Sequence, residues 1–229
     1  MNKQIIEKNE DIRIIMYKEG EILIFSDDLI LVKNFKQDVL YLYKTYFVDN
    51  FKNLYKIIED NPVKICQLKK RVSKIVEYNN NIFILDVFGD VYKLEEDKLI
   101  FIFGSLCSIK DIHIFNDKFY ILDKYQRLRI CQQDGKILNY EFGIKENLIT
   151  TLDNKIKYMR DNDLEHEKIK NNIIFENYKI FIGEKFLHIF DSQKYQKISN
   201  NIEYGNINFG TNGLCYGLEN EKLILLTKK

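Results

Sequence analysis

The sequence has 229 residues, a formal net charge of +1 and an apolar fraction of 45%. This length suits one large or two small domains with a substantial core, and the small net charge excludes nucleic-acid binding by bulk electrostatics alone, although a local basic patch stays possible. The chain lacks the run of about 18 apolar residues that a spanning helix needs. Its N-terminal segment, MNKQIIEKNEDIR, lacks the apolar centre of a signal peptide. We therefore expect no membrane partner.

The first predicted elements are short β-strands. Residues 11–35, DIRIIMYKEGEILIFSDDLILVKNF, alternate between apolar and polar side chains and break at Glu19-Gly20 and at 26–28, which predicts three strands. The stretch 46–62, YFVDNFKNLYKIIEDNP, differs because its apolar residues have helical spacing and end at Pro62. Here we expect either a short helix in a connection or a sheet unit too degenerate to recognise.

Strand patterns then continue along the chain. Residues 72–104 and 109–143 each predict four strands, separated by polar turns such as Asn79-Asn80 and Asn116-Asp117. Residues 160–172, RDNDLEHEKIKNN, are polar and charged and predict a surface loop, and 177–201 predict three more strands. No Pro-rich or Gly/Ser-rich linker divides the chain, so we expect a single domain over 1–229.

The groups of strands recur at the size of a propeller blade. Four-stranded antiparallel units of roughly 40 residues are typical of β-propellers, and closing such units into a ring protects the edges of their sheets. We therefore predict an all-β fold, a WD-repeat-like β-propeller with about five to seven small, degenerate blades.

Catalytic and metal-binding patterns are missing from the sequence. His113 and His188 lie in strand patterns and are interpreted as packed strand residues, and His166 lies in the expected loop without a second ligand at metal-binding spacing. Phosphate-binding glycine loops and G-x-S-x-G elbows do not occur. The four cysteines form no Cys-x-x-Cys pair and are expected to be reduced thiols. We predict no catalytic residue, no metal and no cofactor in this chain.

A basic stretch, LDKYQRLRI (122–130), offers a candidate binding surface. Strand alternation places Arg127, Arg129 and Cys131 on one face and Leu128 and Ile130 on the other. Paired arginines can bind carboxylate or phosphate groups, but a solvated outer strand explains the same pattern. A second basic stretch, LKKRV (68–72), is interpreted as a solvated turn.

Residues 82–152 resemble the WD-repeat, non-catalytic subunit of eukaryotic tRNA (guanine-N7)-methyltransferase. In that family a strand A-D-K-x-G-D-V-Y, a segment L-G-H-x-S-M-L-x-D, a strand pair T-A-D-R-D-E-K-I-R-V and a second L-G-H follow one another. The matching segments keep this order: Leu85–Tyr92, Phe103–Asp111, Leu122–Ile130 and Ile137–Ile149. The sequence departs at both Gly-His dipeptides, where Ser105 and Ile144 replace histidine, and it contains no Trp.

The resemblance implies a scaffold that binds the catalytic subunit as a heterodimer and meets tRNA through the complex. Direct contact of this chain with tRNA would need further basic residues, which LKKRV (68–72) could supply. S-adenosylmethionine would be bound by the partner subunit, and the expected localisation is the nucleus, with the cytoplasm as a further location. Carried over residue by residue, the partner-binding residues are Lys124, Tyr125, Arg127 and Arg129. The alternative is a propeller interaction module of another complex, either ribosome-associated or in trafficking. An enzyme built on a propeller is the third hypothesis.

Overall fold

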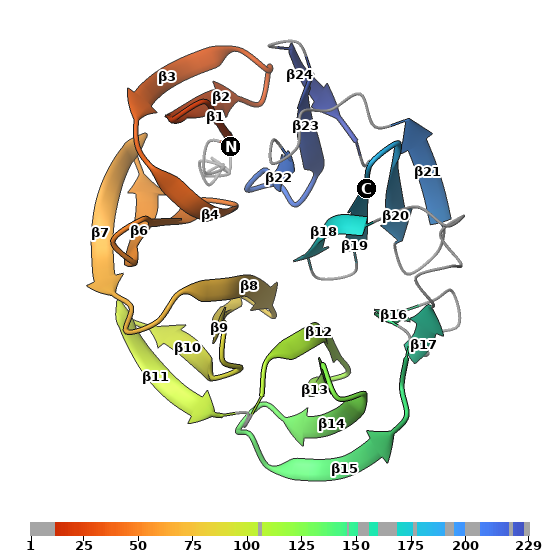
Figure 1. Ribbon diagram of the computed structural model, residues 1–229. Helices are drawn as coiled ribbons and strands as arrows, with labels where there is room; N and C mark the ends of the chain where they lie inside the picture. The colour runs from red at the N-terminus through yellow and green to blue at the C-terminus, as the bar shows by residue number, and fades with distance from the viewer. Residues whose placement is uncertain are drawn as a thin grey trace, which may run out of the picture.

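The computed structural model describes residues 12–104, 107–145, 147–150, 156–159, 169–175, 178–190, 195–199, 207–219 and 222–226. In these ranges the chain forms 24 strands and no helix, which confirms the all-β prediction. The strands build seven antiparallel sheets that follow one another in chain order around a ring (Figure 1). Six of them have three or four strands and form the blades of a β-propeller, and a seventh, two-stranded sheet lies in the ring between the fourth and fifth blades.

The first three blades come from the N-terminal half of the chain. Blade one has three strands: β1 (Arg13–Lys18), β2 (Glu21–Ser26) and β3 (Leu31–Lys36). Blade two has four strands: β4 (Val39–Tyr43), β5 (Tyr46–Asp49), β6 (Asn53–Ile58) and β7 (Asn61–Gln67). Blade three has four strands: β8 (Val72–Tyr78), β9 (Asn81–Asp86), β10 (Val91–Glu95) and β11 (Lys98–Phe103).

The remaining sheets complete the ring. Blade four has four strands: β12 (Ile109–Phe115), β13 (Lys118–Asp123), β14 (Arg127–Gln132) and β15 (Ile137–Phe142). The two-stranded sheet contains β16 (Asn147–Thr150) and β17 (Ile156–Met159). Blade five has four strands: β18 (Ile169–Phe175), β19 (Tyr178–Gly183), β20 (Phe186–Phe190) and β21 (Tyr195–Ser199). Blade six has three strands: β22 (Ile207–Phe209), β23 (Cys215–Glu219) and β24 (Lys222–Leu225).

The second strand of each four-stranded blade is largely buried on both faces and mostly apolar. In β9 the five residues Ile82 to Asp86 are all buried, and β13 ends in the buried run Ile121 to Asp123. Such strands read as continuous apolar runs because neighbouring blades cover both sides. The outermost strands β7, β11 and β15 are mostly exposed. Apolar and polar side chains therefore alternate only weakly along them, and each strand can carry charged residues. Each blade therefore buries its middle and exposes its outer edge.

Tight two-residue turns join several hairpins. At 59–60, 79–80, 96–97 and 116–117 both turn residues have positive φ, between 44° and 65°. Two successive positive φ values match the right-handed twist of the flanking strands, and Asn and Asp tolerate them best among residues with a Cβ. The predicted breaks at Asn79-Asn80 and Asn116-Asp117 are confirmed, and the polar turn residues explain why the sequence showed them.

The ring closes between blade six and blade one. The buried Asn208 side chain donates to the carbonyl oxygens of Ile15 (2.7 Å) and Lys44 (2.9 Å), and it accepts from the Lys44 N–H (2.8 Å). A backbone hydrogen bond of 3.1 Å joins Thr211 N to Arg13 O. Around these bonds lies one apolar cluster with members from both blades: Ile14, Met16, Phe25, Tyr216, Leu218 and Leu223. One amide therefore connects blade six to blades one and two.

The helix considered for 46–62 is wrong, and the alternative of a degenerate sheet unit fits. These residues form β5, β6 and the start of β7 in a regular four-stranded blade. Two tight turns interrupt the strands, so apolar residues that alternate within each strand acquire helical spacing across the whole stretch. Pro62 lies on the outermost strand β7, where an edge position tolerates its missing N–H. The loop expected at 160–172 is also wrong at its end, because β18 begins at Ile169; residues 160–168 lie outside the described ranges.

A buried polar cluster joins blades three, four and five. The carboxylate of Asp111 on β12 is fully buried, accepts a hydrogen bond from Lys179 Nζ on β19 and lies 3.6 Å from Lys74 Nζ on β8. Burial lowers the pKa of Lys179 to about 8, against the opposing effect of Asp111. His113, also on β12, is buried beside this cluster. Three neighbouring blades therefore share one internal ion-pair network.

Candidate functional site

The basic stretch predicted as a binding surface contains a structured turn at its centre. Asp123 ends β13, and its Oδ1 accepts backbone hydrogen bonds from Tyr125 N (2.7 Å) and Arg127 N (3.1 Å). Its Oδ2 accepts from Arg127 Nε (2.6 Å) and from Cys107 Sγ (3.1 Å). Burial acts to raise the pKa of Asp123, but these hydrogen bonds outweigh it and hold that pKa below its usual value. The turn is therefore closed around an ionised carboxylate.

The same turn occurs in three successive blades. Asp49, Asp86 and Asp123 each end the second strand of a blade and follow one another at intervals of 37 residues. In each case Oδ1 accepts the N–H groups two and four residues later, at 2.7–3.1 Å. The residue three positions after the aspartate has positive φ in all three: Lys52, Gly89 and Gln126. We call residues 49–53, 86–90 and 123–127 the Asp turns.

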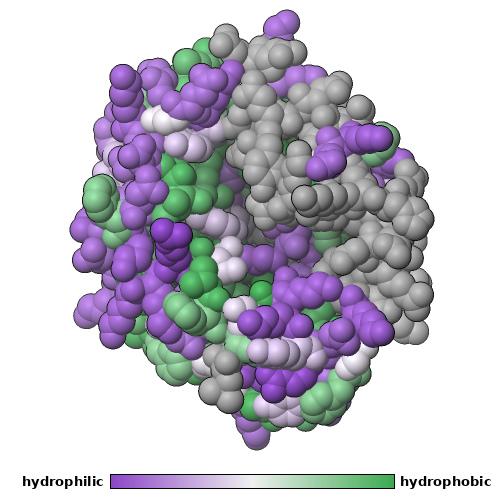
Figure 2. Space-filling model, in the orientation of Figure 1, coloured by the Kyte–Doolittle hydropathy of each residue, from purple (hydrophilic) through white to green (hydrophobic). Residues whose placement is uncertain are grey.

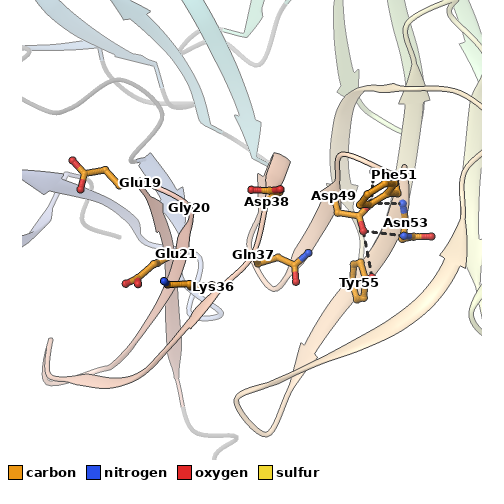
Figure 3. Close-up of a pocket in the computed structure, with 10 residues that line it drawn as sticks. All are labelled: Glu19, Gly20, Glu21, Lys36, Gln37, Asp38, Asp49, Phe51, Asn53 and Tyr55. Carbon is orange, nitrogen blue, oxygen red and sulfur yellow. Dashed lines mark hydrogen bonds between the residues drawn. The ribbon is translucent and has the colours of Figure 1, made fainter.

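The three Asp turns differ at Oδ2. Figure 3 shows Asp49, whose Oδ2 accepts from Asn53 Nδ2 (2.8 Å) and from the Tyr55 hydroxyl (3.3 Å). Burial raises the pKa of Asp49, but the hydrogen bonds from Asn53, Phe51 and Tyr55 lower it by more. In the described structure Asp86 Oδ2 is buried and has no hydrogen-bond donor, and Lys70 Nζ lies 3.5 Å away. The middle turn alone leaves this carboxylate oxygen without a hydrogen bond.

Each Asp turn presents one aromatic side chain to solvent. Phe51, Phe88 and Tyr125 occupy the same position, two residues after the aspartate, and are 73%, 57% and 63% exposed. Successive turns of an antiparallel meander lie at opposite ends of the strands, so the three Asp turns share one face of the ring with the connections between blades. Backbone hydrogen bonds of Leu68 N to Lys52 O and of Val87 N to Arg71 O confirm this proximity. We call this side of blades two to four the turn face.

Basic side chains accompany the aromatic ones. In the described residues the turn face carries several of them, including these: Lys52, Lys69, Lys70, Arg71, Lys124 and Arg127. Lys70 Nζ lies 4.7 Å from the centre of the Phe88 ring, and Lys124 Nζ lies 5.3 Å from that of Tyr125. Exposed contacts between a cation and an aromatic ring are weakly stabilising, so they favour this arrangement and leave the outer sides of both groups exposed. Both predicted basic stretches therefore meet on one surface, together with two aromatic residues, Phe51 and Phe88, that the sequence interpretation missed.

The four candidate partner-binding residues fall into two pairs. Lys124 and Tyr125 are exposed at the tip of the turn. Arg127 donates to Asp123, with its side chain 42% exposed, and Arg129 donates from Nη1 to Gly104 O (2.9 Å) with its guanidinium over the Phe103 ring. The two arginines hold the turn and the contact between blades three and four. A charge reversal at either one would therefore change the fold as well as a binding surface.

The strand alternation expected for this stretch is confirmed, because the pairing of β14 with β13 runs without a break in register. Cys131 lies on the same face as the two arginines and is fully buried there, in one apolar cluster with Phe103 and Phe119. Leu128 and Ile130 lie on the other face, where they pack with Leu122 and Tyr120. No disulfide joins the four cysteines, all of which are described: Cys131 and Cys215 are buried and Cys66 and Cys107 are half-buried. His113 and His188 lie in β12 and β20, as predicted, and His166 lies outside the described ranges.

Replacing Asp123 tests the role of the Asp turn. Asp123→Ala removes the acceptor of two backbone N–H groups and one guanidinium, so we expect a loss of about 2 kcal/mol in the free energy of unfolding. Asp123→Asn keeps an Oδ1 acceptor for the backbone and should lose less than half as much. Urea unfolding of both variants measures the difference. Equal losses would contradict the assigned role of the backbone hydrogen bonds.

A wide polar cavity lies beside the first Asp turn. It has a volume of 660 Å³ and lies between the turn 19–21 of blade one and residues 49–55 of blade two (Figure 3). Glu19, Glu21 and Asp38 line it together with Lys36. Both oxygens of Asp49 are already engaged at its wall. On the face in view, Figure 2 shows hydrophilic residues with apolar patches exposed between them.

The described residues contain no group of three or more His, Cys, Asp or Glu side chains placed to hold a metal ion. The same part of the chain has no helix that is long and apolar enough to cross a membrane. What the turn face offers chemically is aromatic and cationic contact area around a set of closed turns. Such a surface suits recognition of another macromolecule.

Comparisons with known proteins identify the fold. No protein-family model matches the sequence, and no curated protein matches it. Among solved structures, a chain in a complex of S. cerevisiae Dbp5 with Nup159, Gle1, IP6 and ADP has a TM-score of 0.54 at 11% identity, covering 93% of this chain and 86% of that chain. BamB from Moraxella catarrhalis has a TM-score of 0.50 at 9% identity, covering 93% of this chain and 80% of that one. At these identities the likeness shows the fold alone: this chain is a β-propeller.

Proposed function

We propose that this chain is a non-catalytic scaffold that binds a partner protein through its turn face. The propeller fold suggests a protein–protein interaction module. The observation that carries the proposal is the repeated display of Phe51, Phe88 and Tyr125, each exposed at the same position of an Asp turn. Exposed aromatic residues supply most of the affinity at protein interfaces, and the surrounding cations guide orientation and encounter.

The turn geometry supports a preformed surface. The backbone of each turn is fixed by its aspartate before any partner arrives, and Lys70 and Lys124 lie over the rings of Phe88 and Tyr125. Little conformational entropy is then lost on binding, which leaves more of the contact energy as affinity. The positive charge of this face favours a partner with an acidic surface.

For the partner we propose the catalytic subunit of a tRNA (guanine-N7)-methyltransferase. The support is the ordered resemblance over residues 82–152, whose central motif, Leu122–Ile130, contains the exposed Lys124 and Tyr125. In this proposal the partner binds S-adenosylmethionine and methylates tRNA, and the propeller stabilises it. Nuclear localisation belongs to the same proposal.

Capture from cell extract distinguishes this partner from others. The tagged chain should retain a Rossmann-type methyltransferase that transfers methyl groups to guanine N7 of tRNA. Recovery of ribosomal or coat proteins in its place would favour the alternative, an interaction module of another complex, and would contradict the methyltransferase proposal.

Lys124 and Tyr125 provide the sharpest test of the surface. Lys124→Glu with Tyr125→Ala removes one cation and one exposed ring and keeps the hydrogen bonds of Asp123, although Arg127 loses its contact with the Tyr125 ring at 5.6 Å. We expect affinity for the catalytic subunit to fall at least about tenfold, as for interface anchors, with an unchanged unfolding midpoint. Lys98→Glu, an exposed charge at the start of β11 and at the opposite end of the blade, is the matched control. Calorimetric titration measures both, and equal affinities for the two variants would refute the proposed surface.

A further inference from the structure

The middle Asp turn borders a small pocket between blades two and three. This pocket has a volume of 230 Å³, below the roughly 300–1,000 Å³ of small-molecule sites, so it suits one side chain. Its walls are mainly apolar and come from β8, β9, β10, β11 and the β7–β8 connection: Leu68, Val72, Ile84, Tyr92, Leu99 and Phe101. The buried carboxylate of Asp86 and the side chain of Lys70 also line it.

Comparison of the three Asp turns shows what the pocket lacks. In the first turn, the residue four positions after the aspartate is Asn53, which donates to Asp49 Oδ2. In the third turn that residue is Arg127, which donates from Nε to Asp123 Oδ2. In the middle turn it is Asp90, a carboxylate that has no proton to donate when ionised. Asp86 is only 4% exposed, and its Oδ2 has no hydrogen-bond donor in the described structure.

The charges around the middle turn favour a cation. Asp86 and Asp90 bring two carboxylates together, and Lys70 is the cation that contacts both, at 3.5 and 2.9 Å. Burial and the charges of Asp90 and Asp86 raise the pKa of Tyr92 despite Lys70, which agrees with a negative potential at the pocket wall. The side chain of Lys70 is 38% exposed, so it can move aside for another donor.

We propose that this pocket receives an arginine side chain of a partner protein. The guanidinium would donate to Asp86 Oδ2, in the position that Arg127 Nε occupies on Asp123 in the next blade. Its planar group suits the aromatic walls Tyr92 and Phe101, and its methylene groups suit Leu68 and Leu99. The inference rests on the proposed function in one respect, since a partner on the turn face would bring the arginine.

A peptide titration tests the pocket without any partner protein. The probe is acetyl-Gly-Arg-Gly-amide added to the full-length chain with labelled methyl groups. We expect shifts at the methyl signals of Leu68, Val72, Ile84 and Leu99, with the core residue Leu128 of blade four unchanged. The citrulline analogue, which keeps the shape but loses the charge, should bind about tenfold more weakly.

Asp90→Asn provides the decisive variant. It restores the amide donor found in the first Asp turn, so the new side chain should donate a hydrogen bond to Asp86 Oδ2 and keep the fold intact. We therefore expect the affinity for the arginine peptide to fall at least about tenfold. Asp38→Asn, which removes a carboxylate from the turn face outside this pocket, should bind the peptide as the unaltered chain does. Binding by Asp90→Asn equal to that of the unaltered chain, or equal binding of arginine and citrulline peptides, would overturn the proposal. Because no methyltransferase is present, a failure here is distinguishable from a failure to form the proposed complex.

Discussion

Replacement of Asp111 by alanine is expected to destabilise the protein by about 3–5 kcal/mol, the usual cost of removing one partner from a buried ion pair. The Asp111 carboxylate is fully buried, accepts from Lys179 Nζ and lies near Lys74 Nζ. Without this carboxylate, the ammonium groups of Lys179 and Lys74 stay buried but lose the negative charge that offsets the cost of burying them. Because Asp111, Lys179 and Lys74 belong to three blades, the loss should weaken the packing of the ring. Urea unfolding at neutral pH measures the change.

Two further variants separate charge from packing. Asp28→Ala removes an exposed carboxylate in blade one and should change the free energy of unfolding by less than about 0.5 kcal/mol. Asp111→Leu combined with Lys179→Met replaces a charged pair with apolar side chains and should be more stable than Asp111→Ala. If the double variant were less stable than Asp111→Ala, packing around these residues would matter more than their charges.

Acid should destabilise the protein through His113, on the order of 4 kcal/mol between pH 6.5 and pH 3. Burial, and then the charge of Lys179, lower the pKa of His113 to about 3 from an ordinary 6.5, against the opposing effect of Asp111. Between these two values the unfolded chain binds a proton that the folded chain does not, so stability falls as the pH falls. Each unit of difference corresponds to about 1.4 kcal/mol per proton.

The His113→Leu variant isolates this contribution. Asp49 and Asp123 also lose stabilisation in acid, because their folded pKa values are lowered, but only as the pH approaches their ordinary value near 3.8. Between pH 6.5 and 4.5, the urea midpoint of the unaltered chain should fall more steeply than that of His113→Leu. Parallel profiles would mean that His113 is protonated to the same extent in the folded and unfolded states.

The sequence predicted the architecture because propeller strands are short, local and separated by polar turns. Asn79-Asn80 and Asn116-Asp117 marked their hairpins directly, since both residues of each pair need positive φ. The helix considered for 46–62 was wrong because the spacing of apolar residues was taken across two turns, and the apolar pattern alone does not mark those turns. An internal comparison would have corrected it: Asp49-Asn-Phe51 matches Asp86-Val-Phe88 at an interval of 37 residues.

The candidate site was predicted only in part for the same reason. Lys124 and Tyr125 are exposed as a binding surface requires, whereas Arg127 and Arg129 contact Asp123 and Gly104 inside the fold. Strand alternation gives the side of a residue and not the neighbour that it meets in the next blade. That Asp86 Oδ2 lacks a hydrogen-bond donor becomes evident only when the three turns are compared in space. The resemblance over 82–152 includes two of these Asp turns, so part of it reflects the repeat itself.

Reconstitution of methyl transfer tests the central claim, a non-catalytic scaffold, most directly. The chain and the proposed catalytic subunit are purified separately, and N7 methylation of guanine in tRNA is measured for each alone and for the mixture. We predict transfer by the mixture well above that of the catalytic subunit alone, none by this chain alone, and a loss of the increase with Lys124→Glu plus Tyr125→Ala. Transfer by this chain alone, or a mixture no more active than the catalytic subunit, would contradict the account.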